Sequence, residues 1–337
     1  MTKPRASLVS VADTPYYHVI ARCVRRAFLC GEDCVSGKSF NHRRVWLLDR
    51  LKLLTDTFAI DLCAYALMSN HYHLVVHIDV DRARGWCERE VVERWCRLFS
   101  GPAYAQRYLA GGELADWEQV LLACDLERWS ARLSDLSWFM RCLNEWLARA
   151  ANVEDGCTGR FWEGRFKSQA LLDDTALLTA MAYVDLNPVR AGLAAGAPES
   201  DFTSIQQRLF EICRSVGAHG AAADCVIPSL VPFVGAALAD KCVVLPFGLQ
   251  DYLDLVDTGG RIVRADKRGA IAGETPRLLQ TLGIAPDEWF GTVTQIQSRF
   301  ELFVGAPHRL KHIAEQRGWR WLHGLSAARR LYARVNG

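Results

Sequence analysis

The feature that most constrains the fold is a pair of strand-like stretches separated by only two residues. Ile60 to Met68 and His71 to Ile78 both have strand character, and Ser69-Asn70 between them is a turn signal. We therefore predict a tight hairpin. Tyr17 to Cys23 predicts an earlier strand, and the apolar stripe from Arg43 to Thr55 predicts an amphipathic helix. The predicted opening order is strand, helix, strand, strand.

The rest of the chain is expected to be largely helical. Residues 80–134 are rich in charge, Trp and Gly, which predicts a mostly helical insertion. A strong helix is predicted from Asp135 to Asn152, followed by a Gly-broken strand entry around Gly159 to Ser168. A further helix is predicted from Thr175 to Leu186, and it should end near Pro188 because the residue before a proline avoids helical dihedrals.

These elements suggest a division of the 337 residues near residue 210. Residues 1–210 are expected to form the main domain, and residues 211–337 a mostly helical C-terminal region. The end of that region is basic: 13 Lys and Arg stand against 6 Asp and Glu after residue 260. The stretch 309–334, with Trp319 and Trp321 in it, is either a nucleic-acid-binding helix pair or a helical cap whose tryptophans are core.

Charge and hydropathy exclude several classes of protein. The formal net charge of +2 excludes a histone-like polycation but leaves room for a local basic patch. No uncharged apolar run is long enough to predict a membrane span. The N-terminal residues Met1 to Arg5 lead into no apolar signal core, so we expect a protein that is not secreted.

The first candidate for chemistry is His71-Tyr72-His73. Alternate side chains of a strand share a face, so His71 and His73 point the same way. Two imidazoles in this geometry can share one divalent metal and leave positions open for a substrate phosphate. An H-x-H sequence is common in packed or exposed strands, so this pattern alone leaves both interpretations open. His77 lies on the same predicted face.

The second candidate is Tyr183 with Asn187, which are four residues apart and share a helical face. The amide oxygen of Asn187 could complete a metal site, and Tyr183 would then lie about one turn away. A phenol with its ordinary pKa of about 10 is a poor nucleophile at neutral pH. The phenol becomes a competent nucleophile when the phosphoryl group that it attacks is polarised and the negative charge that develops is stabilised. The same sequence pattern would also arise from a tyrosine in the core and an asparagine at a helix end before proline.

The third candidate is a set of cations near aromatic residues. Arg22 and Arg26 follow the first strand, and Arg160, Arg165 and Lys167 flank Phe161, Trp162 and Phe166. Such a set suits single-stranded nucleic acid, because cations contact phosphates and rings stack on bases. A half-exposed strand with core aromatics is the alternative.

Together these stretches resemble the REP-associated tyrosine transposases, a group within the single-tyrosine HUH transposases. The resemblance rests on Tyr17-His18-Val19 with Arg22 and Arg26, on residues 67–76 with the His pair, on Gly164 to Ser168, and on residues 182–193, which contain Tyr183, Asn187 and Arg190. The second and fourth stretches are the specific ones. The resemblance covers about residues 10 to 210.

The resemblance implies an α+β fold with a ferredoxin-like or RRM-like antiparallel sheet and helices on one face. It also implies that His71, His73 and Asn187 bind Mg²⁺ or Mn²⁺ and that Tyr183 is the nucleophile. The DNA-contacting residues would be Arg22, Arg26, Arg160, Arg165, Lys167 and Arg190. The implied reaction is nicking and strand transfer on single-stranded DNA with REP-like hairpins, through a 5′-phosphotyrosine, in the cytoplasm of a bacterium and close to its nucleoid. A homodimer is compatible with the resemblance.

Two other functions fit parts of the pattern. A catalytically silent regulator that binds DNA or RNA hairpins would keep the fold but turn Tyr183 away from the His pair. A metal hydrolase would use the His pair to activate water and would need a nearby carboxylate base, for which Asp79 is the nearest in sequence.

Overall fold

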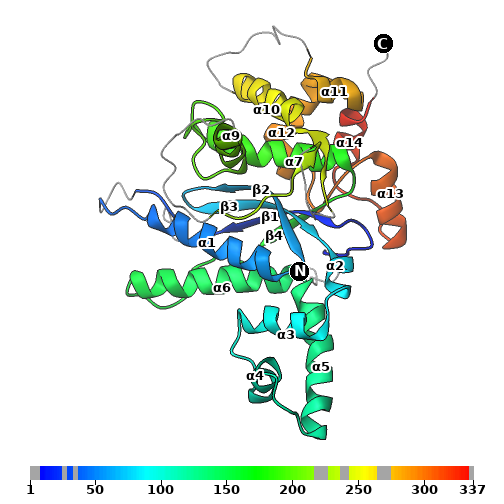
Figure 1. Ribbon diagram of the computed structural model, residues 1–337. Coiled ribbons are helices and arrows are strands. Elements are labelled where there is room, and N and C mark those ends of the chain that lie inside the picture. The colour runs from blue at the N-terminus through cyan, green and yellow to red at the C-terminus, as the bar shows by residue number, and fades with distance from the viewer. Residues whose placement is uncertain are drawn as a thin grey trace.

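Five strands form one sheet at the centre of the protein, in the order β2-β3-β1-β4-β7 (Figure 1). The structure is a computed structural model that describes residues 8–24, 29–32, 37–215, 227–235, 243–263 and 275–333. Neighbouring strands are antiparallel except for β4 and β7, which are parallel. The strands are β1 (Tyr16–Arg22), β2 (Ile60–Leu67), β3 (His71–Ile78), β4 (Lys167–Leu171) and β7 (Phe303–Val304).

The first four strands and two helices follow a ferredoxin-like path, β1-α1-β2-β3-α6-β4. Helices α1 (His42–Thr57) and α6 (Leu136–Glu154) lie together on one face of the sheet (Figure 1). From that face, the Tyr72 hydroxyl of β3 donates to Asn144 Oδ1 of α6 at 2.5 Å. The predicted α+β class, the hairpin and its two-residue turn are therefore confirmed, with β2 ending one residue earlier than expected.

The opposite face of the sheet is also covered, whereas the sequence predicted helices on one face. Helix α7 (Asp174–Asp185) packs on β2, β3 and β4 there, and every residue from Thr175 to Asp185 is buried. A helix that is apolar all round needs neighbours on all sides. Helices α9 (Ser204–Ser215) and α12 (Pro286–Arg299) lie in the same layer, and α12 packs against α7 (Figure 1).

The helix that was expected to end near Pro188 does so, but a second short helix follows it. Helix α7 ends at Asp185, but Leu186 keeps helical dihedrals and a short helix α8 (Asn187–Arg190) follows directly. Pro188 occupies a first-turn position of α8, where its missing N–H costs little. This continuation keeps Asn187 and Arg190 close to the end of α7.

The segment between β3 and α6 is helical, as predicted for residues 80–134. Its helices are α2 (Val80–Arg84), α3 (Glu88–Cys96), α4 (Ala103–Leu109) and α5 (Asp116–Leu133). Figure 1 shows α3, α4 and the far part of α5 projecting away from the sheet. The indoles of Trp95 and Trp129 stack at 5.4 Å between ring centroids, and both belong to the hydrophobic core that the arm shares with the rest of the protein.

The region after residue 210 is mostly helical and shares the core of the sheet. Trp289 of α12 is buried and donates from Nε1 to Thr179 Oγ1 of α7 at 3.1 Å. The remaining elements are β5 (Phe233–Val234), β6 (Leu245–Gly248), α10 (Leu249–Val263), α11 (Arg277–Leu282), α13 (Pro307–Gln316) and α14 (Leu325–Leu331). Within the described ranges, no helix combines the length and the apolar character that crossing a membrane requires.

Candidate active site

Cross-strand register brings three imidazoles together beneath α7. His18 lies opposite Gln169 of β4, and His73 of β3 lies opposite Ile20 of β1, so alternation places His18, His73 and Gln169 on one face. His18 Nε2 is 3.0 Å from His73 Nδ1, and His18 Nδ1 is 2.9 Å from Gln169 Oε1. The ring of His71 is 4.9 Å from that of His73.

Tyr183 reaches this cluster from the helix above the sheet. Its ring centroid is 5.4 Å from that of His73 and 5.6 Å from that of His18, in edge-on contacts. Its hydroxyl oxygen accepts a hydrogen bond of 2.6 Å from Gln297 Nε2 of α12. The side chain is buried, with 6% of its surface exposed. The structure therefore brings the two features that the sequence singled out together, with the Tyr183 ring against His73.

Arg190 closes the other side of the tyrosine. Its guanidinium lies 4.1 Å from the centroid of the Tyr183 ring. It also donates to Asn187 Oδ1 at 3.1 Å and to the carbonyl of Thr294 at 2.9 Å. This residue, predicted to contact DNA, thus uses these donors within the protein and holds Tyr183 and Asn187 in place.

The three histidines are neutral at physiological pH. Burial lowers the pKa of His18 to about 4. Burial, together with the charges of Arg22 and Arg190, lowers the pKa of His71 to about 4. The pKa of His73 is held well below its usual range, chiefly by burial. Neutral imidazoles retain the lone pairs that metal binding and hydrogen-bond acceptance need.

The donor set fits a divalent cation at the His pair and less well at Asn187. His73 Nε2 is buried and has no hydrogen-bond partner. The unpartnered atom of Asn187 is Nδ2, a hydrogen-bond donor, because its Oδ1 is engaged by Arg190. No group of three or more His, Cys, Asp or Glu side chains that could hold a metal ion occurs among the described residues. A metal here would depend on two imidazoles and on an amide oxygen released from Arg190.

Four more of the predicted DNA-binding residues are exposed near one end of the sheet. Arg22 is exposed and lies opposite His71 in the β1–β3 register. Lys167, also exposed, lies opposite Ile20, which is itself opposite His73. Arg160 and Arg165 are exposed on the segment that leads into β4. Arg26, which was predicted to bind DNA as well, lies outside the described residues.

A cavity of about 490 Å³ lies along β4, beside residues that contact the cluster. Arg165 and Lys167 line it together with Gln169 and Gln297, the partners of His18 and Tyr183. Ile20 and Phe166 supply apolar walls. Glu301 also lines the cavity, so a strand of nucleic acid lying there would meet two cations and a carboxylate.

The aromatic residues near these cations are mainly structural. Phe161 is buried, and Trp162 donates from Nε1 to the Asn144 carbonyl at 2.8 Å. In the basic C-terminal stretch, Trp319 packs on Phe303, with 6.1 Å between ring centroids, whereas Trp321 is 75% exposed. Of the aromatic residues Phe161, Trp162, Trp319 and Trp321, only Trp321 leaves most of its ring open to a base.

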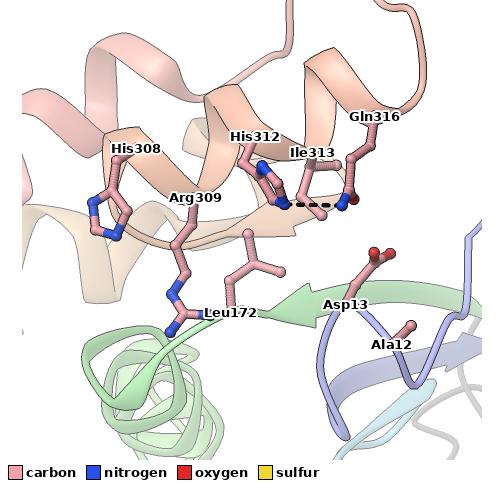
Figure 2. A pocket seen from close by; sticks show the side chains of 8 residues that line it. All are labelled: Ala12, Asp13, Leu172, His308, Arg309, His312, Ile313 and Gln316. Carbon is pink, nitrogen blue, oxygen red and sulfur yellow. Dashed lines mark hydrogen bonds between the residues drawn. The ribbon is translucent and has the colours of Figure 1, made fainter.

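A second basic cavity, of about 410 Å³, lies at the opposite end of β4. Figure 2 shows His308, Arg309 and His312 of α13 on one side of it and Leu172 and Asp13 on the other. His312 is paired with Gln316 at 2.8 Å. The two cavities share none of the residues that line them, and Tyr183 does not line this one.

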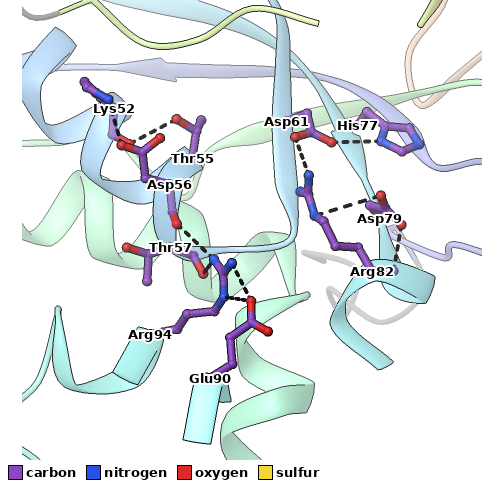
Figure 3. A network of polar contacts seen from close by, with 10 residues as sticks. All are labelled: Lys52, Thr55, Asp56, Thr57, Asp61, His77, Asp79, Arg82, Glu90 and Arg94. Carbon is purple, nitrogen blue, oxygen red and sulfur yellow. Dashed lines mark hydrogen bonds and ion pairs between the residues drawn. The ribbon is translucent and has the colours of Figure 1, made fainter. Parts of the chain in front are cut away.

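His77 takes no part in the cluster, although it shares the face of His71 and His73. Figure 3 shows it at the other end of β3, with its Nδ1 3.4 Å from Asp61 Oδ2. Arg82 also donates to Asp61, at 2.8 Å, and Asp79 caps α2 by accepting from the Arg82 backbone N–H. Asp79, the carboxylate that a hydrolase was expected to use, is thus committed to this network.

Three residues of the cluster were not singled out by sequence reasoning. His18 was noted only within the resembling stretch, although strand alternation and pairing would have aligned it with His73. Gln169 follows the resembling stretch by one residue and has no motif of its own. Gln297 is 114 residues from Tyr183 and lies in the region that the resemblance did not cover. No local signal connects it to the site.

Comparison with known proteins gives limited similarity. No protein-family model matches the chain, and no curated protein matches it. Among solved structures, the chain is similar to a REP-associated tyrosine transposase bound to a REP hairpin. The identity is 11% and the TM-score is 0.38, over 68% of this chain and 99% of that one.

Proposed function

We propose that this protein is a metal-dependent enzyme that nicks single-stranded DNA at hairpins and transfers the strand through a 5′-phosphotyrosine. The observation that carries the proposal is the meeting of Tyr183 with His73 and His18 beneath α7, beside an unpartnered His73 Nε2. A tyrosine that served packing alone would not need a neutral, buried imidazole cluster against its ring.

The reaction assigned to Tyr183 is a transesterification. Its phenolic oxygen forms a bond to the scissile phosphorus, the bond from phosphorus to the 3′-oxygen breaks, and the phenol proton ends on the released 3′-hydroxyl. One phosphate ester replaces another, so the bond energy is kept for rejoining. The Gln297 amide donates to the phenolic oxygen and would stabilise negative charge that develops there.

His71 and His73 are the residues that would hold Mg²⁺ or Mn²⁺, with Asn187 as a third ligand once its oxygen leaves Arg190. A divalent ion bound there supplies Lewis-acid polarisation of the phosphoryl group. The protein's own contribution is to keep both imidazoles neutral and to hold Tyr183 against them.

The cavity along β4 is the proposed path of the DNA strand. Arg165 and Lys167 would contact backbone phosphates, because exposed cations on a groove bind a polyanion with little sequence dependence. Arg22 would do the same beside His71.

The test is a covalent-adduct assay with the full chain, labelled single-stranded hairpin DNA and Mg²⁺ or Mn²⁺. Wild type is compared with Tyr183→Phe, with His73→Ala and with Tyr108→Phe, a matched tyrosine in the distant arm. A metal-dependent adduct that carries only the label 3′ of the cut is expected in wild type and in Tyr108→Phe. Both site variants should lack it.

An adduct of normal yield in Tyr183→Phe would contradict the assignment of the nucleophile. Tight hairpin binding by wild type without any adduct, over several hairpins and both metals, would favour the catalytically silent regulator instead. Homodimer formation is a further proposal, which the mass of the protein–DNA complex in solution would test.

A further inference from the structure

A chain of hydrogen bonds connects His73 through His18 and Gln169 to the backbone carbonyl of Phe300. That carbonyl fixes the direction of every hydrogen bond in the chain. The carbonyl of Phe300, which follows α12, is only an acceptor, and the side-chain Nε2 of Gln169 donates to it. Both residues are buried. The Gln169 amide therefore has one allowed orientation, with Oε1 directed at His18. The reverse orientation would place two carbonyl oxygens against each other with no proton between them.

The orientation of Gln169 determines which nitrogen of His18 carries the proton. Oε1 accepts only, and it lies 2.9 Å from His18 Nδ1, so that nitrogen is the N–H. His18 is fully buried, and its ring nitrogens face Gln169 and His73 rather than a carboxylate, so the ring is neutral because burying an unpaired charge is costly. A neutral imidazole has one proton, which leaves His18 Nε2 with a lone pair.

The proton position on His18 in turn determines which nitrogen of His73 carries a proton. The lone pair of His18 Nε2 faces His73 Nδ1 at 3.0 Å, so His73 Nδ1 must be the donor. His73 Nε2 is then the bare nitrogen, and it is the atom that is buried without a partner. A buried lone pair without a donor is costly to a folded protein unless a ligand uses it.

We propose that the Phe300 carbonyl, Gln169 and His18 form a relay that holds His73 in the tautomer with a bare Nε2, which makes His18 and Gln169 positioning residues for a divalent cation. The identity of the ligand rests on the proposed function, whereas the tautomer does not. Outer partners of this kind orient a ligating imidazole and raise its basicity, and their loss commonly weakens metal binding about 10- to 100-fold.

The relay also gives the C-terminal region a place in the site. The relay begins at Phe300, in the segment between α12 and β7. It ends at His73 of β3, more than two hundred residues earlier in the chain. The pairing of β7 with β4 keeps that segment beside Gln169, because Ala170 N–H donates to the Leu302 carbonyl at 2.8 Å.

The experiment is nitrogen NMR of the full chain with ¹⁵N-labelled histidine, without metal, at pH 7. Protonated and bare ring nitrogens give separate signals, which single His→Gln variants assign to His18 and His73. We expect Nδ1–H and bare Nε2 in both residues of wild type. Gln169→Leu, which removes both the acceptor toward His18 and the donor toward Phe300, should give mixed tautomers at His18 and His73.

Gln207→Leu is the matched control, because Gln207 is also buried and hydrogen-bonded, to Tyr65 and Pro228, away from the histidines. It should leave the histidine signals unchanged. Mn²⁺ titration followed by electron paramagnetic resonance should show affinity about 10-fold or more weaker in Gln169→Leu and unchanged in Gln207→Leu.

A proton on His73 Nε2 in wild type would overturn the relay whether or not any variant folds. Unchanged tautomers in Gln169→Leu would do the same. If the tautomers are as expected but wild type does not bind Mn²⁺, the cation role is wrong. If Mn²⁺ binds as expected and no DNA adduct forms, the relay stands and the proposed reaction fails.

Discussion

At the scale of single residues, Tyr183 lies where two distant parts of the chain meet. Its ring belongs to the layer above the sheet, and its hydroxyl is bound by Gln297 from α12. An amide N–H that points at the phenolic oxygen can stabilise the negative charge that would develop there in the proposed reaction. Gln297 is therefore more than a packing neighbour of the proposed nucleophile.

We expect Gln297→Ala to slow adduct formation about 10-fold, because loss of one hydrogen bond to a charged group costs about 1.5 kcal/mol or more. Hairpin affinity and unfolding temperature should change little. Single-turnover adduct assays and binding titrations measure the two effects. Gln250→Ala, an exposed glutamine on α10, is the matched control. An unchanged adduct rate would remove Gln297 from the site.

Arg165 and Lys167 are expected to act through charge alone. Replacing both by Gln should weaken the binding of unrelated single-stranded DNAs by similar factors. It should also reduce the slope of log affinity against log salt concentration by about 0.7 for each phosphate that the protein no longer neutralises. Arg149→Gln, on the exposed surface of α6, should leave the slope unchanged. A double variant with the wild-type slope would exclude the β4 cavity as the DNA path.

At the scale of elements, the Asp61 network ties the sheet to the helical arm. It joins β2, the end of β3 and the start of α2 (Figure 3). Burial raises the pKa of Asp61, but hydrogen bonds and charge from His77 and Arg82 outweigh it, so the pKa of Asp61 is lowered overall from 3.8. The charged carboxylate therefore contributes to folding stability.

We expect Asp61→Asn to lower the free energy of unfolding at pH 7 by about 1–2 kcal/mol. Because the folded pKa lies below the unfolded one, the contribution of Asp61 is complete above pH 3.8 and is lost as the pH falls through the folded value. Urea unfolding from pH 7 downward should thus show the difference between variant and wild type shrinking only in acid.

Asp56→Asn is the control for this measurement. Asp56 is 45% exposed and pairs with Lys52 on the surface of α1, so its loss should cost less than about 0.5 kcal/mol. A difference between Asp61→Asn and wild type that did not vary with pH would mean that the carboxylate charge is not what joins these elements.

At the scale of the whole molecule, the region after residue 210 completes the sheet, the layer around α7 and the site. Its strand β7 pairs with β4, its helix α12 packs on α7, and Tyr252 of α10 donates to the buried Asp185 at 2.6 Å. The predicted segments 1–210 and 211–337 therefore share one hydrophobic core among the described residues.

A shared core predicts joint unfolding. Trp289→Ala should cost about 3–5 kcal/mol, because the indole is fully buried and bonded to Thr179. Circular dichroism and intrinsic fluorescence should report one coincident urea transition, shifted to lower urea. If the C-terminal region instead unfolded first and left the sheet transition of wild type unchanged, the two regions would be energetically separate.

Local patterns predicted the secondary structure of the first region well. The hairpin of β2 and β3 and the helices α6 and α7 follow from alternation and apolar stripes. The end of α7 was predicted to within one residue, but the short helix α8 was not predicted, because a proline in a first helical turn begins a helix as readily as it ends one. The two-sided cover of the sheet was missed because it depends on helices that follow β4.

The sequence by itself determined that His71 and His73 share a strand face and that Tyr183 and Asn187 share a helical face, because the periods of strand and helix are local properties of the backbone. Only the tertiary structure decided that these faces meet, and that His18, Gln169 and Gln297 join them. Strand order and helix packing arise from burial of apolar surface across the whole chain, and no single segment carries that information.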